Sequence, residues 1–113
     1  MGKPLKYRNT PTHVDGIRFD SKREAKRYGE LKLLQQGGAI SALEVQPRYP
    51  LKAHNPDGEP VKVADYVGDF EYLEGNARVC EDVKSAATAK NPVYRLKIKM
   101  ARAGYPHVEF REV

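Results

Sequence analysis

The most constraining feature of the sequence is a pair of apolar, strand-like segments that carry ionisable residues where strands usually carry valine. The first segment holds Asp69, and the second ends in the tetrad Glu81-Asp82-Val83-Lys84. Asp, Glu and Lys are depleted from β-strands, which favour β-branched and aromatic side chains. These charged residues therefore need solvent, an ion partner or a chemical role.

The two segments are predicted to bring acids together. Val61–Leu73 and Ala77–Lys84 read as antiparallel strands joined by a short turn. Side chains alternate along a strand, so Asp82 and Lys84 project from the same face. With a suitable register, Asp69 stands beside Asp82 on the neighbouring strand.

Two neighbouring carboxylates repel one another unless a cation compensates them. Lys84 supplies part of that compensation, and a hard divalent cation such as Mg²⁺, or Mn²⁺ in its place, supplies more. A metal held by Asp69 and Asp82 would favour phosphodiester hydrolysis, with Lys84 placed to orient or deprotonate the attacking water. The pattern predicts a metal-dependent phosphodiesterase site.

Glu24 has two possible roles. It lies three residues after Ser21, at the start of a predicted helix, and this spacing is typical of a capping box. It also lies on the helix face marked by Tyr28 and Leu31, which is expected to turn toward the sheet. The residue pattern therefore leaves capping and metal ligation open.

The other elements are predicted from hydrophobic period and from turn residues. They are a hairpin Thr12–Phe19 around Asp15-Gly16, a helix from Ser21 to Gly37, a bent extended segment Ile40–Leu51 interrupted by Pro47 and Pro50, a loop His54–Pro60, a flexible connector Ser85–Lys90, a helix from Asn91 to Gly104 with an apolar stripe of Val93, Leu96 and Met100, and a strand His107–Val113. This order predicts an α/β fold with helices on both faces of a mixed sheet.

The length of 113 residues suits one compact domain. We expect residues 1–11 to form a flexible basic arm and residues 12–113 the folded domain. The sequence contains no apolar run of the roughly 20 residues needed to cross a bilayer and no signal-peptide segment, so an intracellular, cytoplasmic protein is expected. The single cysteine, Cys80, excludes an internal disulfide and reads as a small apolar strand residue.

The net charge of +5 favours a polyanionic partner. Basic residues flank an acidic centre, Asp57–Asp82. This distribution suits a protein whose basic residues bind a phosphate backbone while its acids hold a cation against that backbone. The basic residues expected to contact nucleic acid are Lys6, Arg8, Lys22, Arg95, Lys99 and Arg102. The last three form one helical stripe, which is either a solvated face or a row of phosphate contacts.

Three further polar residues are candidates for the predicted metal site because of their position near these acids in the sequence. Glu81 faces away from the predicted site and is expected to pair with a basic residue of a helix. Asp65 shares a face with Asp69 but lies two alternations away, roughly 13 Å, which is too far to bind the same ion. Gln46 could orient a water or ligand, or could be an ordinary amide at a strand edge.

The motifs resemble a phage- and prophage-borne family of short predicted endonucleases, the domain of unknown function 1064, which is placed in the PD-(D/E)XK nuclease superfamily. The resemblance covers the chain from about Lys6 to Tyr105. It rests on the order and spacing of Val14-Asp15-Gly16-Ile17, Phe19-Asp20-Ser21-Lys22-Arg23-Glu24-Ala25, Gln46-Pro47, Tyr66-Val67-Gly68-Asp69-Phe70, Glu81-Asp82-Val83-Lys84, Thr88 and Tyr94-Arg95-Leu96-Lys97.

The resemblance implies a restriction-endonuclease-like core of a helix, three strands, a helix and a strand, with a magnesium-dependent site that acts on DNA. Asp69 then corresponds to the motif aspartate, Asp82 to the second acid, Lys84 to the motif lysine and Glu24 to the helical glutamate. Lys97 joins the expected DNA contacts, because the related motif also has lysine there. The sequence departs from the resemblance at two positions: Gly68 precedes Asp69 where the superfamily name has proline, and Ser85 follows Lys84 where related sequences often carry glycine.

Two functions are compatible with these residues. The first is a Mg²⁺-dependent DNA endonuclease that leaves a 5′-phosphate, with branched or junction DNA as the expected substrate. The second is a non-catalytic nucleic-acid-binding module in which the acids and the lysine form a structural ion-pair cluster. A homodimer is compatible with either function, although the sequence reveals no interface.

Overall fold

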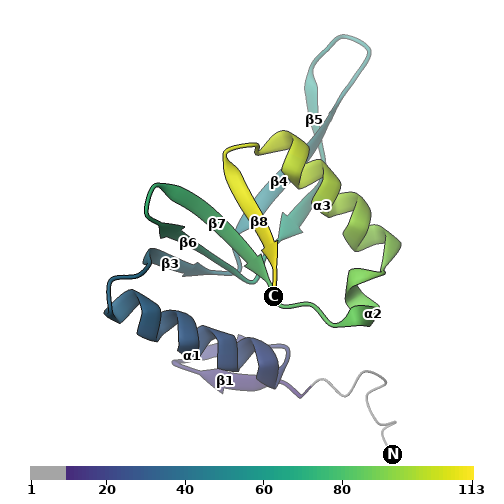
Figure 1. Cartoon of the computed structure of the whole chain (residues 1–113). Coiled ribbons are helices and arrows are strands. Elements are labelled where there is room, and N and C mark those ends of the chain that lie inside the picture. Colours follow the sequence, from purple (N-terminus) through teal and green to yellow (C-terminus); the bar gives the residue numbers. More distant parts are fainter. Residues whose placement is uncertain (1–9) are drawn as a thin grey trace, which may run out of the picture.

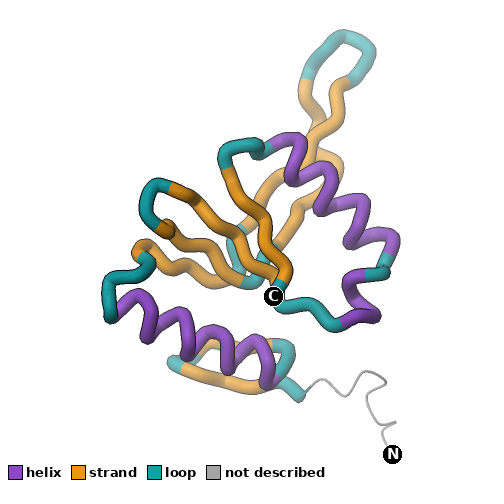
Figure 2. Tube along the Cα trace, viewed as in Figure 1, coloured by secondary structure: helices purple, strands orange, loops and turns teal. Residues whose placement is uncertain are grey.

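A computed structural model describes residues 10–113 as a mixed α/β protein (Figures 1 and 2). In chain order its elements are β1 (Thr12–Val14), β2 (Ile17–Phe19), α1 (Lys22–Gln36), β3 (Ser41–Val45), β4 (Arg48–His54), β5 (Pro60–Val67), β6 (Phe70–Glu74), β7 (Ala77–Asp82), α2 (Ala86–Ala89), α3 (Pro92–Gly104) and β8 (Val108–Glu112). The predicted basic arm, with Lys6 and Arg8, falls mostly outside the described residues. No helix among residues 10–113 is long and apolar enough to cross a membrane.

The central sheet has the strand order β3-β6-β7-β8. Its strands are antiparallel except for β7 and β8, which are parallel and are joined through α2 and α3. The N-terminal hairpin β1–β2 is separate from this sheet, as predicted. Asp15 and Gly16 both have positive φ angles, 53° and 75°, which the tight turn between the two short strands requires.

The two long helices, α1 and α3, cover opposite faces of the sheet. On one face, Ala25, Tyr28 and Leu31 of α1 pack against a core that includes Phe70 and Val79. This confirms the predicted stripe of α1 except at its end, since Leu34 is 40% exposed.

On the other face, Ile98 and Ala101 of α3 pack against the second core, which includes Cys80 and Phe110. The predicted apolar stripe of this helix was wrong. Val93 and Leu96 are 62% and 61% exposed, because the helix turns the side of Ile98 toward the sheet.

The predicted long strand Val61–Leu73 is interrupted at Gly68 and Asp69. Its first part, β5, pairs with β4 in a two-stranded sheet, and its second part, β6, pairs with β3 and β7. Two backbone hydrogen bonds continue the ladder across the break, from Gln46 N–H to Asp69 O (2.9 Å) and from Gly68 N–H to Pro47 O (3.0 Å). We call the whole antiparallel pair β3–β4/β5–β6 the ribbon, and the break its bend.

The bend depends on a close contact between Gly68 and Cys80. A Cβ atom at position 68 would lie 2.4 Å from Sγ of Cys80, far inside van der Waals contact. Cys80 is fully buried, as the sequence predicted, and burial raises the pKa of its thiol to about 12. Glycine is therefore the one residue at position 68 that leaves room for this sulfur.

The segment Ser85–Lys90 was predicted to be a flexible connector, and most of it forms the short helix α2 instead. The Ser85 hydroxyl accepts a hydrogen bond from Thr88 N–H (3.2 Å), so this serine caps the helix. The side chain of Ser85 thus starts a new helix directly after β7 and Lys84.

The contact at the bend predicts a double-mutant effect. Gly68→Ala should lower the free energy of unfolding by about 1–3 kcal/mol, because the new methyl group meets the Cys80 sulfur. Cys80→Ala in the same chain should recover part of that loss by removing the sulfur. Urea denaturation of the four forms measures the coupling.

Gly29→Ala is the matched control, because Gly29 lies in α1 and nothing lies within 4 Å of the added Cβ. This variant should be as stable as the wild type or slightly more so. Simple additivity of Gly68→Ala and Cys80→Ala would contradict the proposed steric origin of the bend.

Candidate active site

The predicted site residues lie at the bend of the ribbon and at the end of β7. Asp69 occupies the bend, Asp82 is the last residue of β7, and Lys84 follows two residues later. Asp69 N–H donates to Glu81 O (3.0 Å), so the bend lies beside the end of β7. Glu24 reaches the same region from the first turn of α1.

Asp69 and Glu24 face one another as two carboxyl groups. Val83 N–H donates to Oδ2 of Asp69 (2.7 Å), which holds this side chain in place. Burial and the charge of Asp69 raise the pKa of Glu24 to about 7. Burial also raises the pKa of Asp69, although the Val83 amide and the charge of Lys84 oppose that shift. The pair therefore resists holding two negative charges at once.

Glu24 takes part in the predicted cap of α1 and also faces Asp69. Its backbone N–H donates to Oγ of Ser21 (3.1 Å), and the Ser21 hydroxyl lies 3.2 Å from its carboxylate, so α1 has a side-chain cap. The same carboxyl group interacts electrostatically with Asp69. Capping and participation in an acidic site are thus compatible in one conformation.

Asp82 is buried on the α3 side of the sheet, with only 1% of the residue exposed. The Tyr66 hydroxyl donates to its Oδ2. Its Oδ1 lies 3.2 Å from Nζ of Lys84 and has no partner of good hydrogen-bond geometry among the described residues. Burial raises the pKa of Asp82, and the charge of Lys84 opposes this rise.

Lys84 forms an ion pair with Asp82 and is close enough to Asp69 for its charge to act there. Its side chain is only 15% exposed, and its ammonium group lies 4.4 Å from the ring centre of Tyr94, close enough for a cation–π contact. It pairs directly with Asp82, and its charge also favours ionisation of Asp69. The lysine is therefore held in one place by an acid and an aromatic ring.

The donor set suits a hard cation only in part. Glu24 and Asp69 form a pair of opposed carboxyl groups, and Asp82 has a buried oxygen without a hydrogen bond. In the described part of the chain, however, no three Asp, Glu, His or Cys side chains gather closely enough to hold a metal ion. Asp82 is turned toward Tyr66, so a shared ion would need its carboxylate to rotate toward Asp69.

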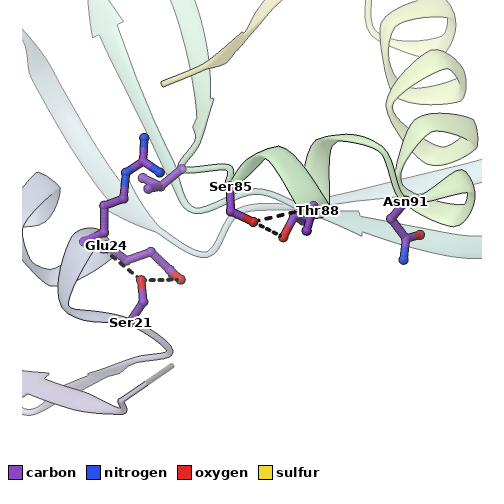
Figure 3. Close-up of a pocket in the computed structure, with 8 residues that line it drawn as sticks. Ser21, Glu24, Ser85, Thr88 and Asn91 are labelled. Carbon is purple, nitrogen blue, oxygen red and sulfur yellow. Dashed lines mark hydrogen bonds between the residues drawn. The ribbon is translucent and has the colours of Figure 1, made fainter. Parts of the chain in front are cut away.

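A cleft of about 490 Å³ opens beside Glu24, and Val83 and Ser85 on either side of Lys84 line it, whereas Asp69, Asp82 and Lys84 themselves do not. Ser21, Ser85 and Asn91 line it, and each of them caps the N-terminus of a helix (Figure 3). Glu24 and Arg23 line the same cleft. Because helix N-termini carry partial positive charge, three of them and an arginine favour an anion in this space.

The prediction that Glu81 pairs with a basic residue of a helix was confirmed. Glu81 is 1% exposed, and Arg27 of α1 donates to both of its carboxylate oxygens (2.8 and 2.7 Å). Burial alone would raise the pKa of Glu81, but the hydrogen bonds from Arg27 and Tyr72 lower it. Asp65 forms ion pairs with Arg48 and Lys62 on the ribbon and is not part of the acid cluster.

Gln46 adjoins the site through its backbone. Its φ of 55° lies in the left-handed region, and its N–H donates to Asp69 O. Its side chain is exposed. Gln46 therefore shapes the bend that presents Asp69, a role that the sequence reading did not include.

The predicted nucleic-acid contacts are distributed over two helices. Lys22 is exposed at the start of α1, and Arg95, Lys99 and Arg102 are exposed along one side of α3. Lys97 is half-buried on that helix. Arg102 also donates to Phe110 O (3.3 Å), so part of its function is structural.

Three residues of the site were missed by the sequence reading. Arg23 lines the cleft and donates to Lys84 O (3.2 Å), and its place beside the Ser21 cap was an available signal. Tyr66 and Tyr94 hold Asp82 and Lys84. In a continuous strand, Tyr66 would point away from Asp82's face, so no pattern in the sequence indicated this contact.

The raised pKa of Glu24 predicts a pH dependence of stability. Between its usual value of 4.5 and about 7, the folded protein keeps a proton that the unfolded chain has lost. Without divalent cations, the free energy of unfolding should therefore fall as pH rises through this window. Glu24→Gln should reduce that slope in urea titrations at several pH values.

Glu44→Gln provides the control, because Glu44 is an exposed glutamate of β3. It should keep the wild-type slope. An unchanged slope in Glu24→Gln would contradict the opposed-carboxyl arrangement.

Comparison with known proteins identifies the family of the chain. Residues 4–113 match the family described as Protein of unknown function (DUF1064). The chain has no significant match among curated proteins or among solved structures. Since the match spans nearly the whole sequence, the protein belongs to the DUF1064 family.

Proposed function

We propose that this protein is a Mg²⁺-dependent endonuclease that hydrolyses DNA phosphodiester bonds. The observation that carries the proposal is the grouping of Lys84 with the buried Asp82 and the half-buried Asp69 at the end of β7, close to a cleft that Glu24 and Arg23 line. A lysine and carboxylates close to a space that can take a phosphate are what phosphodiester hydrolysis needs.

The cleft supports binding of a phosphate group of the substrate. The N-cap residues of α1, α2 and α3 line it, and Arg23 adds a guanidinium group. Arginine pairs well with phosphate oxygens through two parallel hydrogen bonds. In this proposal a backbone phosphate lies in the cleft, and exposed basic residues such as Lys22 contact its neighbours.

Asp69, Asp82 and Glu24 are the residues that would hold Mg²⁺ or Mn²⁺. Such an ion, when bound, polarises the phosphodiester and lowers the pKa of a coordinated water. Lys84 orients the attacking water through its ammonium group. Tyr94 and Asp82 keep this group in position.

Membership of the PD-(D/E)XK superfamily is part of the proposal. It is supported by the order of helix, strands, helix and strand, and by the positions of Asp69, Asp82 and Lys84 along it. By likeness to that superfamily, cleavage leaves a 5′-phosphate. We propose branched or junction DNA as the substrate, in the cytoplasm of a bacterium or a phage-infected host.

A second candidate function is a nucleic-acid-binding module without catalysis. The observation that favours it is the existing pairing of Asp82, which already has the Tyr66 hydroxyl and Lys84 as partners. In that case the acids and the lysine stabilise the end of β7, and the basic residues bind nucleic acid alone.

The endonuclease proposal predicts loss of cleavage in Asp69→Asn and Lys84→Ala. Each change removes a group that acts on the transition state, so the cleavage rate should fall at least about 100-fold. DNA binding, measured by fluorescence anisotropy, should remain close to that of the wild type. The assay uses Mg²⁺ or Mn²⁺ with single-stranded, duplex, flapped and four-way-junction DNA.

Asp57→Asn and Lys52→Ala are matched controls, because both residues are exposed on the β4–β5 hairpin. These variants should cleave at nearly the wild-type rate. Full activity of Asp69→Asn and Lys84→Ala would rule out the proposed site.

Metal binding separates the two candidate functions without an activity readout. Isothermal titration calorimetry with Mg²⁺ should show binding to the wild type that is lost in Asp69→Asn and weakened in Glu24→Gln. The binding module predicts no Mg²⁺ binding that depends on Asp69 or Asp82. Binding that survives both Asp69→Asn and Asp82→Asn would place the ion elsewhere.

A further inference from the structure

A second pocket adjoins the cleft along α1, and we call it the side pocket. Its volume is about 280 Å³, and the residues that line it are Arg23, Lys26, Arg27, Glu30, Val83 and Val113. Arg23 and Val83 line the cleft as well, so the two spaces meet at these side chains. Together they follow α1 from Ser21 to Glu30, roughly 14 Å of helix, which is longer than a single phosphate group needs.

The side pocket contains two cations that no acid neutralises. Arg27 already forms ion pairs with Glu81 (2.7 Å) and Glu30 (3.0 Å). By contrast, Lys26 and Arg23 are exposed and form no ion pair within residues 10–113. The hydrogen bond from Arg23 to a backbone carbonyl leaves most of its N–H donors for another ligand. The side pocket is therefore suited to an anion.

The opposite side of the side pocket is apolar. Val83 and Val113 directly follow the parallel strands β7 and β8, and neither valine is fully buried. A ligand that fits here needs an anionic group on one side and an apolar part on the other. A nucleic-acid strand has both, because its charged phosphates alternate with sugars that carry bases with apolar faces.

We propose that the side pocket binds a second phosphate of the same nucleic-acid strand whose first phosphate lies in the cleft. Lys26 and Arg23 are its ligands. These residues are three positions apart on one helix, with about 5–6 Å between their Cβ atoms, so both can reach one phosphate. Arg23 lies where the two spaces meet and contacts both phosphates. The inference rests on the proposed function, because it extends the strand beyond the phosphate in the cleft.

An acidic peptide fits the two spaces less well. Its carboxylates are carried on separate flexible side chains, whereas a nucleic-acid strand has a phosphate at every link of its backbone. Two adjacent pockets for anions match that regular spacing. Poly-L-glutamate is the probe for the alternative, and it should displace labelled single-stranded DNA much less effectively than unlabelled DNA of the same charge concentration does. Equal displacement would overturn the proposal in favour of a general anion surface.

The salt dependence of binding tests the role of Lys26. Fluorescence anisotropy with a labelled single-stranded oligonucleotide is measured in EDTA, so that no cleavage occurs. Lys26→Ala should raise the dissociation constant roughly two- to fivefold. It should also reduce the slope of log K against log salt by about 0.7, the value for one phosphate of a single strand.

Lys52→Ala is the matched control, because Lys52 is an exposed lysine of the β4–β5 hairpin and lies outside the side pocket. It should keep the wild-type dissociation constant and slope. Equal values for Lys26→Ala and Lys52→Ala would overturn the proposal. Circular dichroism and thermal unfolding check that each variant is folded.

Glu30 provides a test in the opposite direction. It lines the side pocket and pairs with Arg27. Glu30→Gln should bind the oligonucleotide more tightly than the wild type, because it removes a negative charge beside the phosphate and releases part of the Arg27 guanidinium. Damage to the fold would weaken binding instead. Glu44→Gln, at an exposed glutamate of β3, should leave affinity unchanged. Unchanged or weaker binding by Glu30→Gln would contradict the proposed phosphate position.

Short oligonucleotides count the phosphates that are bound. The thymidine dinucleotide has one phosphate and the trinucleotide has two, and NMR titration measures their affinities. The wild type should bind the trinucleotide more tightly, whereas Lys26→Ala should bind both almost equally. This result in a protein that cleaves no DNA with Mg²⁺ would support the side pocket and contradict the endonuclease proposal. Wild-type discrimination by Lys26→Ala would overturn the side pocket and leave the endonuclease proposal intact.

Discussion

The close packing of the Gly68 backbone against the Cys80 sulfur is the contact on which the rest of the structure depends. Because no side chain stands between them, the ribbon turns sharply without breaking its ladder of hydrogen bonds. β6 can therefore join the central sheet while β5 leaves it to pack against α3. The same turn presents Asp69 beside the end of β7, so fold and candidate site share one constraint.

Four acids lie near the end of β7, and they are compensated to different degrees. Glu81 has the guanidinium group of Arg27, and Asp82 has the Tyr66 hydroxyl and Lys84. Asp69 has one amide and the more distant charge of Lys84, and it faces Glu24, whose pKa is raised to about 7. Electrostatic compensation is least complete between Glu24 and Asp69, which is where a cation gains most.

Much of the fold could be predicted because it depends on local patterns. The Asp15-Gly16 turn, the Ser21 cap, the apolar residues of α1 and the direction of Glu81 away from the predicted site follow from turn chemistry and side-chain period. Local pattern failed on α3, which contains two apolar stripes. The helix buries Ile98 and exposes Val93 and Leu96, and only the shape of the surface beneath it selects between the stripes.

The candidate site, too, could be predicted from local patterns only in part. Residue types and the alternation of side chains along a strand were enough to propose Asp69, Asp82 and Lys84 as site residues and to exclude Glu81 from the predicted site. The period assumes a continuous strand, however, and the bend at Gly68 ends that continuity. Tyr66 therefore reaches Asp82, and Asp69 turns toward Val83 and Glu24. These contacts join segments far apart in the sequence, so they arise from the packing of the ribbon over β7 and not from any local preference.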